Sequence, residues 1–309
     1  VNLIEPYDEL EHFRHSLMSL EKYAEFDDSN ENENKSYFDT VKITNDGFYS
    51  VEIDWKPEVI DKVPSHYKLC RILAVKGFYR NKKLKIHDKY FEIFKEQLNE
   101  GIIECIPSDV DLEECKFIPH RAVVRTDPLV QTTKVRIVYN CSFSIGKKPC
   151  INDAVSFPPD LMASLLDLLL YFRTNNYFAI ADIKAAFLNV KLRKQSDRNK
   201  FCCVAFHNGK YYHWRFTTLC FGFILSPYFL NLVLKFHASL QSDEKLRDAI
   251  GNKLYVDNLL LTSNNVAELC RLGADAYTSL NEHKLLLRQW NCSNNEVLQI
   301  GRASCRERV

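Results

Sequence analysis

Apolar and polar residues alternate along several short stretches of the chain, which is the period of a half-buried strand. Such stretches predict strands at residues 48–55, 117–126, 133–142, 176–182 and 284–290. Residues 200–217 hold two more runs on either side of Asn208-Gly209, a pair that strongly favours a hairpin turn. A second hairpin is expected in residues 253–263, KLYVDNLLLTS, with Asp257-Asn258 as its turn.

Other stretches carry apolar residues at a spacing of three or four, which predicts helices. The helical pattern covers residues 59–104 (with an amphipathic part that stops at Gly101), 159–175, 226–240 and 265–280. The leucine-rich helix at 159–175 is expected to be buried, and Ser226 is expected to cap the helix that Pro227 opens. Strands and helices in this order predict an α+β fold, an antiparallel sheet backed by helices.

The Asp257-Asn258 turn supports two interpretations. In the first interpretation, the Asp-Asn pair between apolar runs is a simple hairpin turn with no further role. Alternatively, Asp257 is a metal ligand together with Asp182, which ends the strand predicted at 176–182. Two carboxylates on adjacent strands suit Mg²⁺, which prefers oxygen ligands. A single strand-end aspartate is more often a cap or turn residue, so the pair depends on its surroundings.

Composition and charge narrow the class of protein. The chain has 309 residues, 46% of them hydrophobic and 26% charged, as in a globular protein with a core. Residues 1–58 carry 15 acidic and 5 basic side chains, so the remainder carries 36 basic and 25 acidic ones. A basic body favours a polyanionic partner. No apolar stretch is long enough to span a bilayer, and the eleven cysteines form no paired zinc motif.

Several segments together resemble a known family. ADIKAAFLNV, LCFGFILSPYFLN and KLYVDN follow one another as motifs A, B and C of reverse transcriptases do. FIPHRAVVRT, TTKVRIVYNCS and KPCINDAVSFPPDLMASLLDLLLYFR are similar to the fingers and early palm of Pao/BEL-type LTR retrotransposon polyproteins. The resemblance covers roughly Tyr37 to Leu298. It implies a right-hand polymerase fold with fingers and palm, and an RNA-directed DNA polymerase activity.

The resemblance also implies roles for individual residues. Asp182 and Asp257 become the catalytic, metal-binding carboxylates, with the Ile183 carbonyl as a further ligand and Asn258 beside them. Two Mg²⁺ ions are implied as cofactors, with Mn²⁺ as the alternative. Such a pair of ions clamps the entering and leaving oxygens of a phosphoryl transfer.

Nucleotide binding is assigned in the same way. Arg136 and, less directly, Arg125 are expected to grip the triphosphate, since a guanidinium matches phosphate oxygens. The remaining residues implied at the nucleotide are Ala186, Phe187, Gly222 and Ser226. Phe187 matches a steric gate that excludes the sugar 2′-hydroxyl and so favours dNTPs. Ordinary core packing is the alternative for this ring.

The chain departs from the family pattern at three places. Asn258 replaces the usual second aspartate of motif C, Asn140 stands where Asp is common, and Gln289 lies near the position of a motif D lysine, for which Lys284 or Arg288 could substitute. Two other functions therefore stay open. One is an inactive nucleic-acid-binding relic of such a polymerase, and the other, disfavoured by Phe187, is an RNA-dependent RNA polymerase.

The resemblance divides the chain into four parts. Residues 1–36 are expected to be an acidic, disordered polyprotein segment, 37–175 an extension plus fingers, and 176–299 the palm, with a fingers hairpin inserted at about 200–217. Residues 300–309, IGRASCRERV, resemble the translation of a sequencing adapter. The thumb is expected to be absent, which would leave Leu285–Leu287 on an exposed edge.

The expected partners follow from the same resemblance. They are an RNA/DNA template–primer, dNTPs and the protease, RNase H and integrase of a polyprotein, but no membrane. The expected location is a cytoplasmic virus-like particle, or the nucleus.

Overall fold

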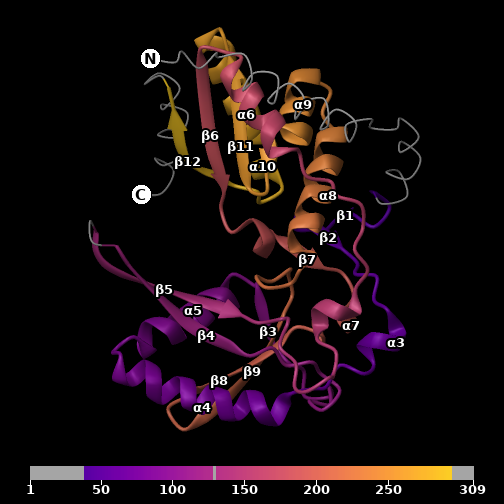
Figure 1. Cartoon of the computed structure of the whole chain (residues 1–309), viewed down its shortest axis with the longest axis vertical. Coiled ribbons are helices and arrows are strands. Elements are labelled where there is room, and N and C mark those ends of the chain that lie inside the picture. Colours follow the sequence, from indigo (N-terminus) through magenta and orange to yellow (C-terminus); the bar gives the residue numbers. More distant parts are fainter. Residues whose placement is uncertain (1–37, 128–129, 294–309) are drawn as a thin grey trace, which may run out of the picture. The chain divides into compact units, whose positions relative to one another are not determined.

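The computed structural model describes residues 38–127 and 130–293 (Figure 1). The chain divides into two compact units, Val1–Asp39 and Thr40–Val309, and every feature below lies in the second. The expected segments 1–36 and 300–309 fall outside the described residues. Helices and sheets are mixed throughout the second unit, so the predicted α+β class is confirmed.

One antiparallel sheet has the strand order β10-β11-β6-β12 (Figure 1). Its strands are β10 (Leu254–Tyr255), β11 (Asn258–Ser263), β6 (Tyr177–Ile183) and β12 (Leu287–Cys292). Alternate residues of β6 and β11 are buried, among them Ala179, Ala181, Leu259 and Leu261. Helix α10 (Val266–Glu282) packs against β11 and β6. The predicted sheet backed by helices is therefore present.

Two further helices accompany this sheet. Helix α8 (Ser226–Ser239) is apolar and largely buried, and it packs against α9 (Glu244–Asn252), which the sequence pattern does not predict. The cap of α8 is Leu225, while the Ser226 hydroxyl donates to the Cys220 carbonyl at 2.8 Å. The predicted serine cap is therefore wrong, although the helix begins where expected.

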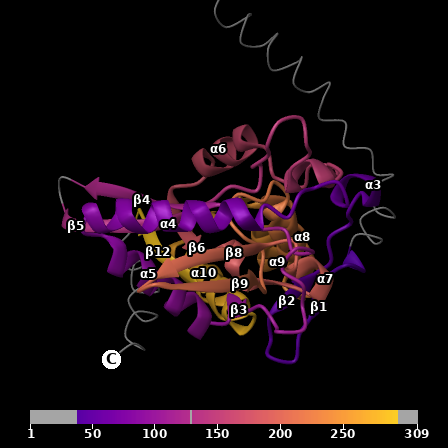
Figure 2. The same ribbon diagram turned by 90° about the horizontal axis from the view of Figure 1, so that it is seen from below.

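A second sheet contains β3 (Ile103–Cys105), β9 (Lys210–Phe216) and β8 (Cys202–His207). The β8–β9 hairpin turns at Asn208-Gly209, as predicted. Helix α4 (Tyr67–Lys83) packs against β8, as Figure 2 shows, and α5 (His87–Asn99) packs against α4 and β3. Gly101 has a φ of +66° just after α5, where the predicted stop lies. Residues 103 and 104 lie in the stretch with the helical pattern, but with Cys105 they form β3 and pair with β9.

The remaining strands are short or form a separate ribbon. Strands β4 (His120–Asp127) and β5 (Val130–Tyr139), both predicted as strands, pair with each other in an antiparallel ribbon. A third sheet joins β1 (Lys42–Ile43), β2 (Tyr49–Val51) and β7 (Val190–Leu192), in which β2 and β7 are parallel. The short helical elements are α3 (Pro57–Ile60), η2 (Ile151–Ala154), η3 (Ala186–Asn189) and α7 (Gln195–Arg198).

Two expectations about burial are wrong. Helix α6 (Leu165–Arg173) lies in the stretch expected to be buried, yet only Leu168 is; Leu165, Leu166, Leu169 and Leu170 are exposed. Conversely, Leu285 and Leu287, expected on an exposed edge, are both buried. Apolar composition alone does not say which side of a helix or strand another element covers.

The thiols are mostly inside the fold. Cys70, Cys115, Cys141, Cys150, Cys202, Cys203 and Cys220 are buried and free, and among the described cysteines only Cys105 is exposed. Burial raises the pKa of the Cys70 and Cys203 thiols. None of the helices in the described ranges has both the length and the apolar character needed to cross a bilayer.

Candidate functional site

Asp182 lies in the middle of a row of side chains that crosses three strands. In the antiparallel registers, Asn258 of β11 and Arg288 of β12 are both directly opposite Asp182 of β6. Directly opposed residues in an antiparallel pair point to the same face of the sheet. One face therefore presents an amide, a carboxylate and a guanidinium side by side.

Asp257 joins this row from the hairpin turn. Its carbonyl accepts a 2.8 Å hydrogen bond from the Ile183 N–H, so the turn is tied to the end of β6. The amide of Asn258 donates to Oδ1 of Asp257 at 3.0 Å. The two predicted carboxylates are thus brought together, with Ile183 and Asn258 beside them.

The turn itself differs from the prediction by one residue. Tyr255 pairs with Asn258, so the reversal is Val256-Asp257, and Asn258 is the first residue of β11. Val256 has a φ of +57°, a left-handed conformation that is uncommon for a β-branched residue. In a two-residue turn the first central position is normally Gly, Asn or Asp when its φ is positive. The hairpin therefore holds strain next to Asp257, as functional sites often do.

The charges of the row compensate one another. Nε of Arg288 donates to Oδ2 of Asp182 at 2.9 Å. Burial raises the pKa of the Asp257 carboxyl, and the negative charge of Asp182 raises it further. The Arg288 guanidinium acts in the opposite direction and lowers this pKa, so a positive charge near the two carboxylates is favourable.

An open cleft of about 810 Å³ lies over Asp182, Asp257 and Arg288, whereas Asn258 does not line it. Most of the predicted site residues line it: Arg136, Asp182, Ile183, Ala186, Phe187, Gly222 and Asp257. Lys184, Arg288 and Gln289 line it as well. The cleft therefore contains two carboxylates and three basic side chains, which suits a ligand with negative charges and a bound cation.

The floor of the cleft is formed by η3 and the loop before α8. Phe187 lies edge-on to Phe221, with ring centroids 5.3 Å apart, and it borders the cleft rather than the core. Gly222 has a φ of +98°, and a Cβ there would lie 2.5 Å from the Tyr139 carbonyl oxygen. Only glycine fits this close approach of two backbones. Asn152 holds the loop, donating to the Gly222 carbonyl at 3.1 Å and accepting from the Ile224 N–H.

The other predicted residues lie in different surroundings. Arg136 is on β5 at the edge of the cleft and is exposed. Arg125 is on β4, and its side chain falls outside the described part. Ser226 is buried behind the loop and does not line the cleft. The exposed Asn140 accepts a hydrogen bond from the Ser142 N–H.

Two residues of the site have little or no signal in the sequence. Asn152 has none, since its partners are about seventy residues away in the chain. The sequence pattern indicates Arg288 only as a replacement for a lysine, whereas it pairs with Asp182. The register of β12, which decides this pair, shifts between Arg288 and Asn291, where Gln289 has a φ of +54°.

Solved structures of foamy virus enzymes resemble the chain at low similarity. The foamy viral protease-reverse transcriptase in complex with an RNA/DNA hybrid is 16% identical with a TM-score of 0.47, over 64% of this chain and 23% of that chain. The dRH form of the foamy viral enzyme with double-stranded DNA is 18% identical with a TM-score of 0.45, over 62% and 28%. The chain spans less than a third of the length of these enzymes. No family model and no curated protein match the sequence.

Proposed function

We propose that the cleft catalyses template-directed addition of dNTPs to a primer 3′-hydroxyl, as an RNA-directed DNA polymerase of the Pao/BEL type. The observation that carries the proposal is the placement of Asp182 near the end of β6 and of Asp257 in the adjoining hairpin turn, where both line an open cleft with basic side chains. The order of the three sequence motifs supports the polymerase class, and in this assignment the described residues form fingers and palm.

The donor set fits divalent cations. The pKa of Asp257 is raised by burial and by Asp182, and Arg288 already holds a positive charge against Asp182. Asp182, Asp257 and the Ile183 carbonyl would hold Mg²⁺ or Mn²⁺, two ions in the active complex. When bound, such ions stabilise the charge that develops on the entering and leaving oxygens.

The chain's own residues orient the reactants. Arg136 and Lys184 lie where they can bind the negative charges of a triphosphate along the cleft wall. Phe187 and the Gly222 loop border the position of the sugar and base. In-line attack of the primer hydroxyl on the α-phosphorus would form the new phosphodiester bond while the bond to the pyrophosphate leaving group breaks and the hydroxyl proton passes to solvent. The rate would depend mainly on positioning, which is the main contribution of a protein in phosphoryl transfer.

The partners follow from this reaction. The ligands are an RNA/DNA template–primer and dNTPs, and the natural context is a polyprotein with protease, RNase H and integrase in a virus-like particle. Ser226 acts through the loop in front of it, since its hydroxyl fixes the Cys220 carbonyl. Arg125 is assigned to the triphosphate with Arg136.

Primer extension on an RNA template tests the proposal. The chain should extend with dNTPs in Mg²⁺ or Mn²⁺, and Asp182→Asn and Asp257→Asn should each lower the rate at least about a hundredfold, because each removes a charged ligand. Asp275→Asn is the matched control, since Asp275 is an exposed carboxylate on α10 that pairs with Arg271. Extension by either cleft variant at the control rate would rule out the assignment.

A second function is favoured by one specific observation. Asn258 stands where the family pattern has a carboxylate, and Arg288 pairs with Asp182, so the site carries less negative charge than a site with a third carboxylate and no guanidinium. In that case the chain binds template–primer without extending it. Filter binding and extension on the same sample distinguish the two functions.

A further inference from the structure

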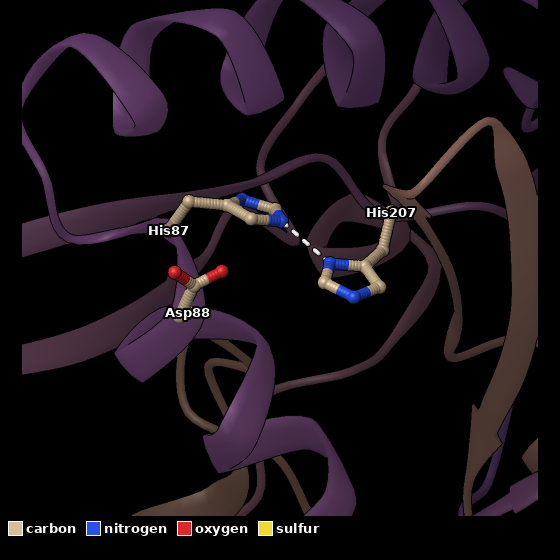
Figure 3. A group of neighbouring side chains, drawn as sticks. All are labelled: His87, Asp88 and His207. Atoms are coloured by element: carbon tan, nitrogen blue, oxygen red, sulfur yellow. Dashed lines mark hydrogen bonds between the residues drawn. The ribbon is translucent and has the colours of Figure 1, made fainter.

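A second cluster of metal-ligating side chains lies outside the cleft, between α5 and the β8–β9 hairpin (Figure 3). His87 is the first residue of α5, Asp88 follows it, and His207 is the last residue of β8. One potential ligand atom from each lies within 4.8 Å of the other two, and no other such trio occurs within residues 38–127 and 130–293. We propose that these three side chains bind a divalent transition-metal ion, with Zn²⁺ as the best match.

The two imidazole rings face each other through their nitrogen atoms, as Figure 3 shows. Nε2 of His87 and Nδ1 of His207 are 2.8 Å apart, a distance that requires a proton on one of the two nitrogens. Two nitrogens that bind one tetrahedral Zn²⁺ at about 2.0–2.1 Å are roughly 3.4 Å from each other. A small opening of the contact therefore allows a metal ion to replace the shared proton.

Aromatic neighbours hold both rings in this orientation. His207 stacks on Phe91 with centroids 4.0 Å apart and an interplanar angle of 6°. His87 is buried and lies edge-on to Phe78, with centroids 4.5 Å apart. Since the rings are already oriented, binding costs little side-chain freedom, as in a preorganised site.

The buried side of His87 offers the second hydrogen bond that a metal-bound imidazole usually makes. Nδ1 of His87 and Oδ1 of Asn81 are both buried and have no partner among the described residues. Both residues line one cavity of about 20 Å³, enough for one water molecule. Histidine ligands commonly donate their other N–H to a water or a carbonyl. Donation from Nδ1 leaves the Nε2 lone pair directed at His207 and the ion.

Asp88 supplies the third ligand from the solvent side. Its side chain is 81% exposed and pairs with Lys82 at 3.2 Å, an exposed ion pair of the kind that contributes little. The carboxylate is therefore free to turn toward the ion. Two nitrogens and one oxygen favour Zn²⁺, Ni²⁺ or Cu²⁺ over Mg²⁺, which prefers oxygen alone. The bound ion would connect α5 to the hairpin and leave one position for water.

Zn²⁺ titration of the chain by calorimetry, in millimolar Mg²⁺ to occupy the cleft, tests the proposal. One Zn²⁺ should bind per chain, and His207→Gln should weaken binding by at least about tenfold. Asp88→Asn should weaken it less. His213→Gln is the matched control, because His213 lies in the same hairpin with its ring against the Tyr67 hydroxyl, 3.1 Å away. Circular dichroism confirms that each variant is folded.

Co²⁺ as a probe separates this site from the thiols. Visible d–d absorption should appear with the wild-type chain and with His213→Gln, and should be lost in His207→Gln. Equal Zn²⁺ affinity in His207→Gln and wild type would overturn the proposal. A thiolate-to-Co²⁺ charge-transfer band would also overturn it, since it would assign the binding to cysteines. The outcome is independent of primer extension.

Discussion

Nε of Arg288 and Oδ2 of Asp182 are 2.9 Å apart, in directly opposed positions of β12 and β6. The guanidinium therefore lies against a carboxylate that the proposed reaction assigns to divalent cations. It competes with a metal ion in the free chain, and it is 45% exposed, so it can swing away when an ion binds.

Replacement of Arg288 should strengthen cation binding. Arg288→Gln removes an exposed ion pair worth up to about 1 kcal/mol, so Mn²⁺ should bind up to about fivefold more tightly. Electron paramagnetic resonance of free Mn²⁺ measures the change. Arg271→Gln, which removes a guanidinium from Asp243 and Asp275 on the surface, should leave the affinity unchanged. Weaker binding in Arg288→Gln would show that the guanidinium supports the site.

Asn258→Asp should make the fold more dependent on metal. Asn258 is directly opposite Asp182, so an aspartate there opposes like charges and should cost up to about 1 kcal/mol without cations. In Mg²⁺ the third carboxylate should restore stability and raise the extension rate, because Mg²⁺ prefers carboxylate oxygen. Thermal unfolding with and without Mg²⁺ measures the difference. Asn258→Ala adds no charge, so Mg²⁺ should not increase its stability or its extension rate beyond the unmodified chain. An increase as large as that of Asn258→Asp would contradict the explanation.

Phe187→Ala should relax the choice of sugar. The ring borders the cleft and is supported by Phe221, so its removal opens space for a 2′-hydroxyl. Incorporation of NTPs relative to dNTPs should rise at least about tenfold, since discrimination by a clash is lost on truncation. Single-nucleotide extension with each nucleotide measures the ratio, and Phe187→Tyr should keep it low. An unchanged ratio in Phe187→Ala would leave the ring as a packing residue.

Gly222→Ala should destabilise the chain by about 1–3 kcal/mol, because the residue has a positive φ and its Cβ would meet the Tyr139 carbonyl oxygen. Gly77→Ala is the matched control. Gly77 is inside α4, and a methyl group there would meet no atom within 4 Å, so the change should stabilise by about 0.5–1 kcal/mol. Urea unfolding of both variants measures the change in the free energy of unfolding. A change of the same sign in both variants would refute the steric argument.

Stability should fall as the pH drops from 6.5 toward 4. Burial lowers the pKa of His120 and of His237 to about 4, from an ordinary value of 6.5. Between these values the unfolded chain binds more protons, so the free energy of unfolding decreases with falling pH, by up to about 1.4 kcal/mol per pH unit for each histidine. Urea unfolding at several pH values measures the slope. His237→Gln should reduce the slope by up to about 1.4 kcal/mol per pH unit, and an unchanged slope would exclude His237 as a source.

Local patterns in the sequence predict the elements that local interactions decide. The Asn208-Gly209 hairpin, the β4–β5 ribbon, β6 and α10 are all found in this way, because turn residues and periodicity are local signals. The closeness of Asp182 and Asp257 is also predicted correctly, but that prediction rests on the family resemblance and not on local patterns. The predicted position of the turn is wrong by one residue, because nothing local predicts that Val256 adopts a left-handed conformation.

Local patterns do not predict the register between distant strands, nor which face of a helix or strand another element covers. The pairing of Arg288 with Asp182 depends on the register of β12, which shifts after Arg288. The hydrogen bond from Asn152 to the Gly222 carbonyl joins segments that are far apart in the chain. The leucines of α6 are predicted to be buried since the pattern is apolar on more than one face, yet coverage depends on neighbours. The closeness of His87 and His207 likewise arises from the packing of α5 near the hairpin.

Because most of the described thiols are buried, their rates of chemical labelling measure how often the fold opens around them. Among the described cysteines, a maleimide should react first at Cys105 under native conditions, while Cys70, Cys141 and Cys203 stay protected until the fold opens. Reaction also requires the thiolate, which burial disfavours by raising the thiol pKa of Cys70 and Cys203. Mass spectrometry of the labelled peptides would therefore time local opening around each cysteine separately, without any introduced dye or tag.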